Sequence, residues 1–115
     1  FFDNEVFYHF LLKARKAGIT VPIIPGIMPV TNYAQLDRMI QITGCNVPIK
    51  LWNYFDRYKD DKAALEEIGL IFTSYQILDL ISNDVDGIHI YSMNKSEFIN
   101  RLMENISYIA TEFFK

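Results

Sequence analysis

Apolar residues recur every three or four positions over most of this chain, which predicts that helices dominate its structure. The first predicted helix begins at Asn4, with Asp3 as its N-cap. Its basic residues cluster towards the end, and Gly18 follows where a left-handed C′ residue is expected. The pattern therefore predicts one helix between Asp3 and Gly18.

Three more helices are predicted in the middle of the chain. Thr31 or Asn32 can cap the first of them, and Gly44 closes it. The second is short and has Pro48 in its first turn. The third is long and ends at 82–84. The residues that follow the helical spacing in these three helices are Leu36, Met39, Ile40, Thr43, Leu51, Trp52, Phe55, Leu65, Ile68, Phe72, Tyr75 and Leu78.

A last helix is predicted after 92–94, a segment rich in capping residues. Its apolar stripe consists of Phe98, Leu102, Ile106, Ile109 and Phe113.

Two short segments have the composition of buried strands, Val21–Ile24 and Gly87–Tyr91. Pro25 and Gly26 are expected to stop the first strand. The following residues 27–30 are too apolar for a solvated turn, so this loop is expected to lie beneath another element or a ligand. The initial Phe1–Phe2 resembles the tail of a further strand.

The predicted order alternates strands with helices, which favours parallel pairing through right-handed crossovers. Two strands and a stub cannot bury both faces of a parallel sheet. We therefore expect further strands before residue 1, in a helix-covered sheet or a closed barrel.

Composition limits the classes of function. Half of the 115 residues are hydrophobic, which is enough for the core of one domain. The net charge is −3, and the 11 Lys and Arg are scattered among 14 acids, so nucleic acid is not an expected partner. No apolar run is long enough for a membrane span. The single cysteine, Cys45, fits a reducing compartment, and we expect a cytoplasmic protein.

No nucleotide-binding, metal-binding or nucleophile motif is present, so candidate residues come from the carboxyl ends of the strands, where ligands bind in βα folds. These are Asp3, 25–32 and 91–95. His89 and Tyr91 should project from the same side of their strand. A hydrogen-bonded core role is favoured for His89, whereas Tyr91 could floor a pocket or fill an interior.

Gln35 and Lys95 are the remaining polar candidates. Gln35 lies one turn into its helix and can reach back to the strand ends with a donor and an acceptor. Lys95 follows Asn94 at the start of the predicted last helix, where the dipole disfavours a cation. Either an anionic ligand lies beside it or it points into solvent.

Three runs of this sequence together resemble the C-terminal part of the methylenetetrahydrofolate reductase family: FFDN (1–4), AGITVPIIPGIMPVTNYAQL (17–36) and GIHIYSMNK (87–95). The resemblance implies an α/β fold, a partial (βα)8 TIM barrel with about the last three βα units and a helical insertion before the final strand. Residues 1–115 would be the C-terminal fragment of a single barrel domain.

The resemblance also implies a flavoprotein that uses FAD to pass a hydride from NADH or NADPH to 5,10-methylenetetrahydrofolate, giving 5-methyltetrahydrofolate. Gln35, Tyr91 and Lys95 match folate-binding positions, although Lys95 stands where the family usually has arginine. Met39 matches a position where some relatives carry a pocket phenylalanine. No catalytic residue and no metal ligand is assigned in this chain.

The family's general acid and most FAD contacts would lie before Phe1, in the N-terminal half of the barrel. This fragment alone is therefore expected to be inactive, and the full-length protein to be a homo-oligomer. The alternative is a non-catalytic interaction or regulatory module with the same βα fold.

Overall fold

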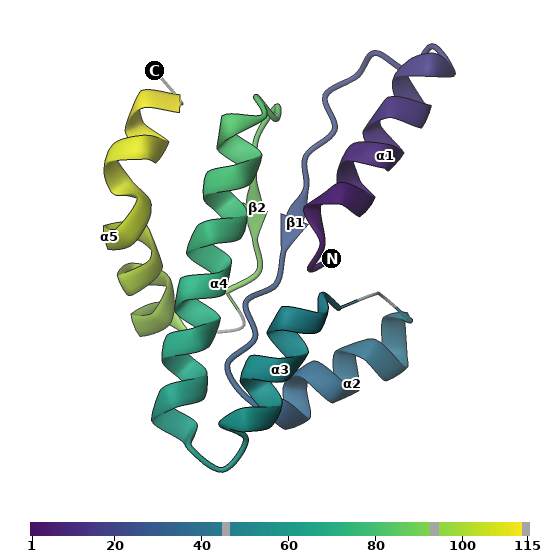
Figure 1. The fold of residues 1–115 in the computed structure, drawn as a ribbon. Helices are drawn as coiled ribbons and strands as arrows, with labels where there is room; N and C mark the ends of the chain where they lie inside the picture. Colours follow the sequence, from purple (N-terminus) through teal and green to yellow (C-terminus); the bar gives the residue numbers. More distant parts are fainter. Residues whose placement is uncertain (45–46, 93–94, 114–115) are drawn as a thin grey trace.

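The computed structural model describes residues 1–44, 47–92 and 95–113, so Cys45 and the predicted capping residues 93–94 lie outside the described ranges. The side chain of Phe113, predicted in the last apolar stripe, also lies outside them. Within these ranges the chain forms α1 (Asn4–Lys16), β1 (Gly26–Ile27), α2 (Tyr33–Thr43), α3 (Ile49–Arg57), α4 (Lys62–Ser82), β2 (His89–Ile90) and α5 (Ser96–Phe113). From Asn4 onward the predicted order of helices and strands is confirmed (Figure 1), whereas the strand tail expected at Phe1–Phe2 is not a strand.

The predicted ends of α1 and α2 are confirmed. Asp3 caps α1 by accepting a hydrogen bond from the backbone N–H of Glu5, and Gly18 follows with a φ of +88°. Asn32, rather than Thr31, caps α2, and Gly44 closes it with a φ of +65°. Pro48 was expected in the first turn of α3. It is instead the N-cap, so the helix begins one residue later, at Ile49.

The first strand lies further along the chain than predicted. Gly26–Ile27, not Val21–Ile24, pairs in parallel with His89–Ile90. The N–H of His89 donates to the Pro25 carbonyl at 2.9 Å, and that of Tyr91 donates to the Ile27 carbonyl at 2.9 Å. Pro25 does not stop the ladder because a proline lacks only the N–H, and its carbonyl still accepts. Phe1 and Phe2 lie outside this ladder.

Helices cover one face of the two-stranded ladder. Ile27 is fully buried with Phe7 of α1 and Leu80 of α4, while Ile88 and Ile90 pack against the cluster between α4 and α5. In Figure 1, α4 lies between α1 and α5, and both strands run towards the end that carries α2 and α3. The described chain is therefore an α/β unit with parallel strands and helices on one face.

The other face of the ladder is open. Ile24, His89 and Tyr91, which alternate with the buried positions, are all exposed. The prediction of a buried, hydrogen-bonded His89 is wrong, because its side chain belongs to this open face. We call these three residues the open face of the ladder.

The proline-containing loop after β1 lies beneath a helix, one of the two coverings expected for it. Val30 is buried in a cluster with Leu36 and Leu65. A Cβ built on Gly69 of α4 would lie only 2.1 Å from the carbonyl oxygen of Val30, so the loop backbone contacts α4 directly. Glycine at 69 permits this approach.

The predicted buried stripe of α4 is partly wrong. Tyr75 is 70% exposed and Leu78 is 39% exposed. Because α4 contacts α1, α3 and α5, its buried surface is wider than one stripe and is rotated from the predicted one. Its buried residues are Leu65, Gly69, Leu70, Thr73, Gln76, Ile77, Leu80 and Ile81.

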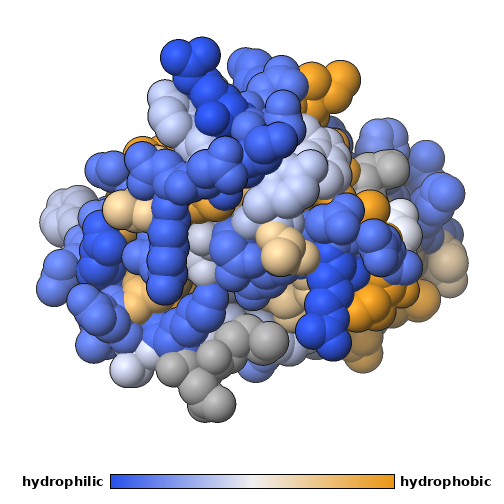
Figure 2. All heavy atoms as spheres, turned by 90° about the horizontal axis from the view of Figure 1, so that it is seen from below, coloured by the Kyte–Doolittle hydropathy of each residue, from blue (hydrophilic) through white to orange (hydrophobic). Residues whose placement is uncertain are grey.

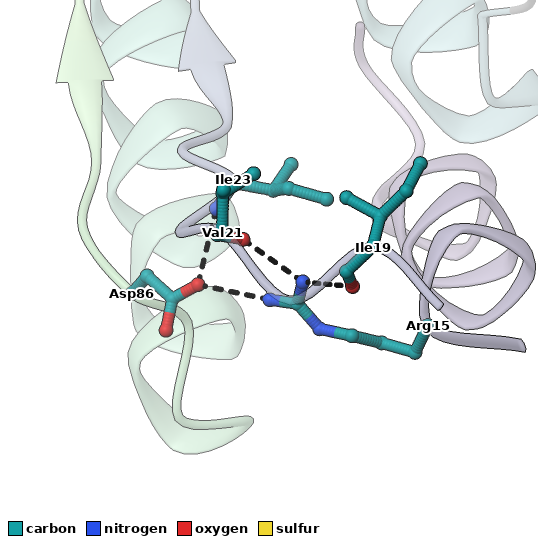
Figure 3. Close-up of polar contacts among 5 residues, drawn as sticks. All are labelled: Arg15, Ile19, Val21, Ile23 and Asp86. Carbon is teal, nitrogen blue, oxygen red and sulfur yellow. Dashed lines mark hydrogen bonds and ion pairs between the residues drawn. The ribbon is translucent and has the colours of Figure 1, made fainter. Parts of the chain in front are cut away.

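At the amino ends of the strands, a hydrogen-bonded clamp joins the two strand entries (Figure 3). The Arg15 guanidinium donates to the carbonyls of Ile19 and Val21 at 2.9 Å each, and to the Asp86 carboxylate at 3.2 Å. The same carboxylate oxygen accepts from the Ile23 N–H at 3.1 Å. One ion pair thus holds the segment before β1 beside the segment before β2.

Candidate functional site

The candidate site lies at the carboxyl ends of β1 and β2. The loop from Met28 to Asn32 leaves β1 there, and Tyr91 and Lys95 follow β2. Figure 2 views this end of the molecule from below, and hydrophilic side chains dominate it, with hydrophobic patches between them.

Gln35 folds back to the loop, as the sequence predicted. Asn32 Oδ1 accepts a hydrogen bond from the Gln35 backbone N–H at 2.7 Å, which starts α2. The side-chain Oε1 of Gln35 in turn accepts from the backbone N–H of Thr31 at 3.1 Å. In a usual capping box the side chain at the third helical position bonds the N–H of the N-cap residue itself. Here the Gln35 side chain bonds the N–H of the residue before the N-cap, so the two bonds form a variant of that motif.

Lys95 also reaches Thr31. Its Nζ donates to the Thr31 hydroxyl at 2.6 Å, across 64 residues of sequence. Lys95 is half-buried, and Thr31 is only 6% exposed. The alternative that Lys95 points freely into solvent is therefore wrong.

Thr31 was considered from sequence only as a possible N-cap, yet it is the residue that brings Gln35 and Lys95 together. A threonine directly before an N-cap asparagine was the only sequence signal for it. Its contact with Lys95 joins segments far apart in the chain, so local patterns could not reveal it.

Tyr91 is placed by the ladder rather than by these polar groups. A Cβ on Gly26 would lie 2.9 Å from Cε2 of Tyr91, so the ring lies over β1. The ring also meets His89 edge-on, with centroids 4.5 Å apart. Within the described residues, no side-chain hydrogen bond joins Tyr91 to Gln35, Thr31 or Lys95.

Two other candidates have structural roles. Asp3 is the N-cap of α1, as its position before the helix suggested. Met39 is half-buried one turn after Gln35 on α2, and its carbonyl accepts from the Thr43 hydroxyl at 2.6 Å.

A polar groove of about 380 Å³ opens beside Thr31 and Lys95. It is lined by Thr31, Glu66, Lys95, Ser96, Glu97, Phe98 and Arg101. Cations and acids are both present, so the groove has no strong net charge.

The described residues contain neither a cluster of metal ligands nor a membrane-spanning helix. Among them no group of three or more His, Cys, Asp or Glu side chains converges as metal ligands would. No helix within them combines the length and the apolar character that a bilayer span requires.

An α/β unit with parallel strands and polar residues at their carboxyl ends belongs to the class of folds that bind small ligands there. A family model described as methylenetetrahydrofolate reductase matches residues 1–107. The chain belongs to the methylenetetrahydrofolate reductase family.

Curated relatives agree with this assignment. The chain is 34% identical over 115 residues to methylenetetrahydrofolate reductase 2 of Saccharomyces cerevisiae, covering 97% of this chain and 19% of that protein. It is 32% identical over 97 residues to 5,10-methylenetetrahydrofolate reductase of Escherichia coli, covering 84% and 33% respectively. It is 28% identical over 109 residues to methylenetetrahydrofolate reductase (NADH) 1 of Arabidopsis thaliana, covering 95% and 18%. The chain thus spans between about a fifth and a third of the length of these relatives.

Proposed function

We propose that this chain is the folate-binding, C-terminal part of the catalytic barrel of a flavin-dependent methylenetetrahydrofolate reductase. The full enzyme would reduce 5,10-methylenetetrahydrofolate to 5-methyltetrahydrofolate with NADH or NADPH. The observation that carries this proposal is the junction of Gln35 and Lys95 at Thr31, because both residues match folate-binding positions of the family.

The open face of the ladder supports the partial (βα)8 barrel. In such a barrel, helices lie outside and alternate strand residues point inwards. Here helices cover one face, while Ile24, His89 and Tyr91 are exposed on the other. Residues 1–115 would supply about the last three βα units of a single barrel domain, with α2 and α3 as the helical insertion, and the remaining strands would cover the open face.

The side chains at the strand ends suit the two chemically different parts of a folate. The Gln35 amide can hydrogen-bond a neutral polar group, and the Tyr91 ring offers a flat surface for a ring. Lys95 can attract the acidic glutamyl tail. Because lysine is a point charge, it would hold a carboxylate less rigidly than the arginine usual in the family.

FAD would supply the hydride-transfer chemistry of the full enzyme. The described part of this chain does not itself fit the cofactor, since a diphosphate is held by backbone N–H cradles or clustered cations. The groove at these strand ends is lined by two cations, Lys95 and Arg101, and by two acids, Glu66 and Glu97, and so is not a cluster of cations. We therefore assign the flavin contacts and the general acid to the N-terminal half of the barrel. The role left to this chain is to bind and orient the folate.

The test uses the full-length protein that contains this chain. We expect purified protein to be yellow and to oxidise NADH or NADPH with menadione or methylenetetrahydrofolate as acceptor. Lys95→Ala should raise the KM for the folate about tenfold and leave the flavin content unchanged. A tenfold change is the expected effect of losing one charge-assisted hydrogen bond. Lys16→Ala, which removes an exposed cation at the last turn of α1, is the matched control.

An unchanged folate KM in Lys95→Ala would remove Lys95 from the site. Colourless protein without NAD(P)H oxidation would favour the alternative, a non-catalytic interaction module. One observation favours that alternative: an apolar groove of about 550 Å³ between α3 and α4, where Ile71 is 61% and Tyr75 is 70% exposed. The same groove is available for the homo-oligomer that we propose for the full-length enzyme.

A further inference from the structure

Gln35 and Lys95 contact the same residue from two sides. Thr31 offers its backbone N–H to Gln35 Oε1 at 3.1 Å and its hydroxyl to Lys95 Nζ at 2.6 Å. One buried residue therefore sets the position of both predicted folate ligands. No direct hydrogen bond joins Gln35 to Lys95 in the described part of the chain.

The contact with Thr31 fixes which way the Gln35 amide faces. A backbone N–H can only donate, so the side-chain atom that faces it must be the oxygen. The Nε2 of Gln35 makes no hydrogen bond within the described residues, and its two hydrogens remain for a ligand. Gln35 thus presents donors rather than the mixed donor and acceptor expected from its sequence position.

The hydroxyl of Thr31 is a firm anchor for Lys95. Threonine is branched at Cβ and has restricted χ1 rotamers, and Thr31 is 6% exposed in a loop held against α4. The lysine ammonium can donate three hydrogen bonds, and the anchor uses one. Among the described residues no carboxylate forms an ion pair with Lys95, although Glu66 and Glu97 line the same groove.

We propose that Thr31 is a positioning residue for folate, acting through Gln35 and Lys95. Its backbone turns the Gln35 amide donors towards the ligand, and its hydroxyl holds the Lys95 charge at a fixed distance from them. This inference rests on the proposed reductase function, and it adds a residue for which the sequence predicted no binding role.

Two substitutions in the full-length enzyme separate the hydroxyl from the shape of the side chain. Thr31→Val keeps the branched shape and the backbone N–H, whereas Thr31→Ser keeps the hydroxyl. We expect Thr31→Val to raise the folate KM about fivefold to tenfold, with kcat and the menadione reaction within twofold of wild type. Thr31→Ser should restore a KM close to that of wild type.

A double-mutant cycle with Lys95→Met distinguishes positioning from general damage. If Thr31 acts through Lys95, then Thr31→Val/Lys95→Met should have the same folate KM as Lys95→Met alone. Additive effects on KM, no rescue by serine, or equal losses with folate and menadione would overturn the inference. An inactive wild-type enzyme would instead overturn the proposed function, so the two failures are distinguishable.

Discussion

At the scale of single residues, two glycines allow close contacts of different kinds. A Cβ at position 69 would meet the backbone oxygen of Val30 at 2.1 Å, whereas a Cβ at position 26 would meet the Tyr91 ring at 2.9 Å. The backbone of a buried loop cannot move aside easily. A ring that is 47% exposed can rotate.

We therefore expect Gly69→Ala to destabilise the full-length protein by about 3 kcal/mol or more, at the upper end of the overpacking range. Gly26→Ala should lower the free energy of unfolding by less than about 1 kcal/mol, because the Tyr91 ring can move aside. It should raise the folate KM, because the displaced ring no longer lies where the folate would bind. Urea unfolding and steady-state kinetics of both variants test this contrast. Equal losses of stability in the two variants would contradict it.

Local sequence patterns identified Gln35 because its effect is local. The Asn32 cap and the return of the Gln35 side chain both lie within one helical turn. The role of Thr31 could not be found in this way, since Lys95 lies 64 residues away. The exposure of His89 depends on which strands are present beside it, which its own segment does not encode.

At the scale of elements, helix ends were the most predictable features of the fold. Asp3 and Gly44 act through neighbouring backbone groups, so their sequence positions suffice, whereas the sequence left Thr31 and Asn32 as alternative caps of α2. The strand position was not predictable in the same way. Which residues near Pro25 enter the ladder depends on the register of β2, which is set by the packing of Ile27, Ile88 and Ile90 against the helices.

A polar junction ties α1 to α4. The Tyr8 hydroxyl donates to the Asp79 carboxylate at 2.6 Å, and Asn4 Nδ2 donates to the same oxygen at 2.8 Å. Burial, followed by the hydrogen bond to Asp79, raises the pKa of Tyr8 well above its ordinary value. A phenol whose pKa is raised in the folded state stabilises the protein below its unfolded pKa and loses that contribution as pH rises further.

We expect Tyr8→Phe to lower the free energy of unfolding by about 1 kcal/mol at pH 7, because Asp79 loses one hydrogen-bond donor. Above about pH 10, where an unfolded tyrosine ionises, the wild type should lose stability and the difference from the variant should narrow. Tyr108→Phe is the control, since Tyr108 is 77% exposed. A difference between wild type and Tyr8→Phe that stays constant up to pH 11 (about one unit above that ionisation) would contradict this account.

At the scale of the whole molecule, one side of the α/β unit is covered and the other is open. On the covered side Ile27 and Leu80 are fully buried, whereas Ile24 on the open face is 55% exposed. The unpaired edges of a short ladder and exposed apolar side chains both favour association with other chains. The groove between α3 and α4 is a second apolar surface, with Ile71 61% exposed.

Residues 1–115 produced alone should therefore associate, and the open face should be responsible. We expect sedimentation velocity to detect species larger than the 13.5 kDa monomer. Ile24→Glu should reduce this association, because a carboxylate on the open face resists burial. Ile71→Glu, a charge of the same kind in the α3–α4 groove, should leave it unchanged. If Ile71→Glu alone disperses the chain, the groove is the interface between copies. A monodisperse wild-type monomer with a cooperative melt would show that the open face needs no covering strands, contrary to its proposed place inside a barrel.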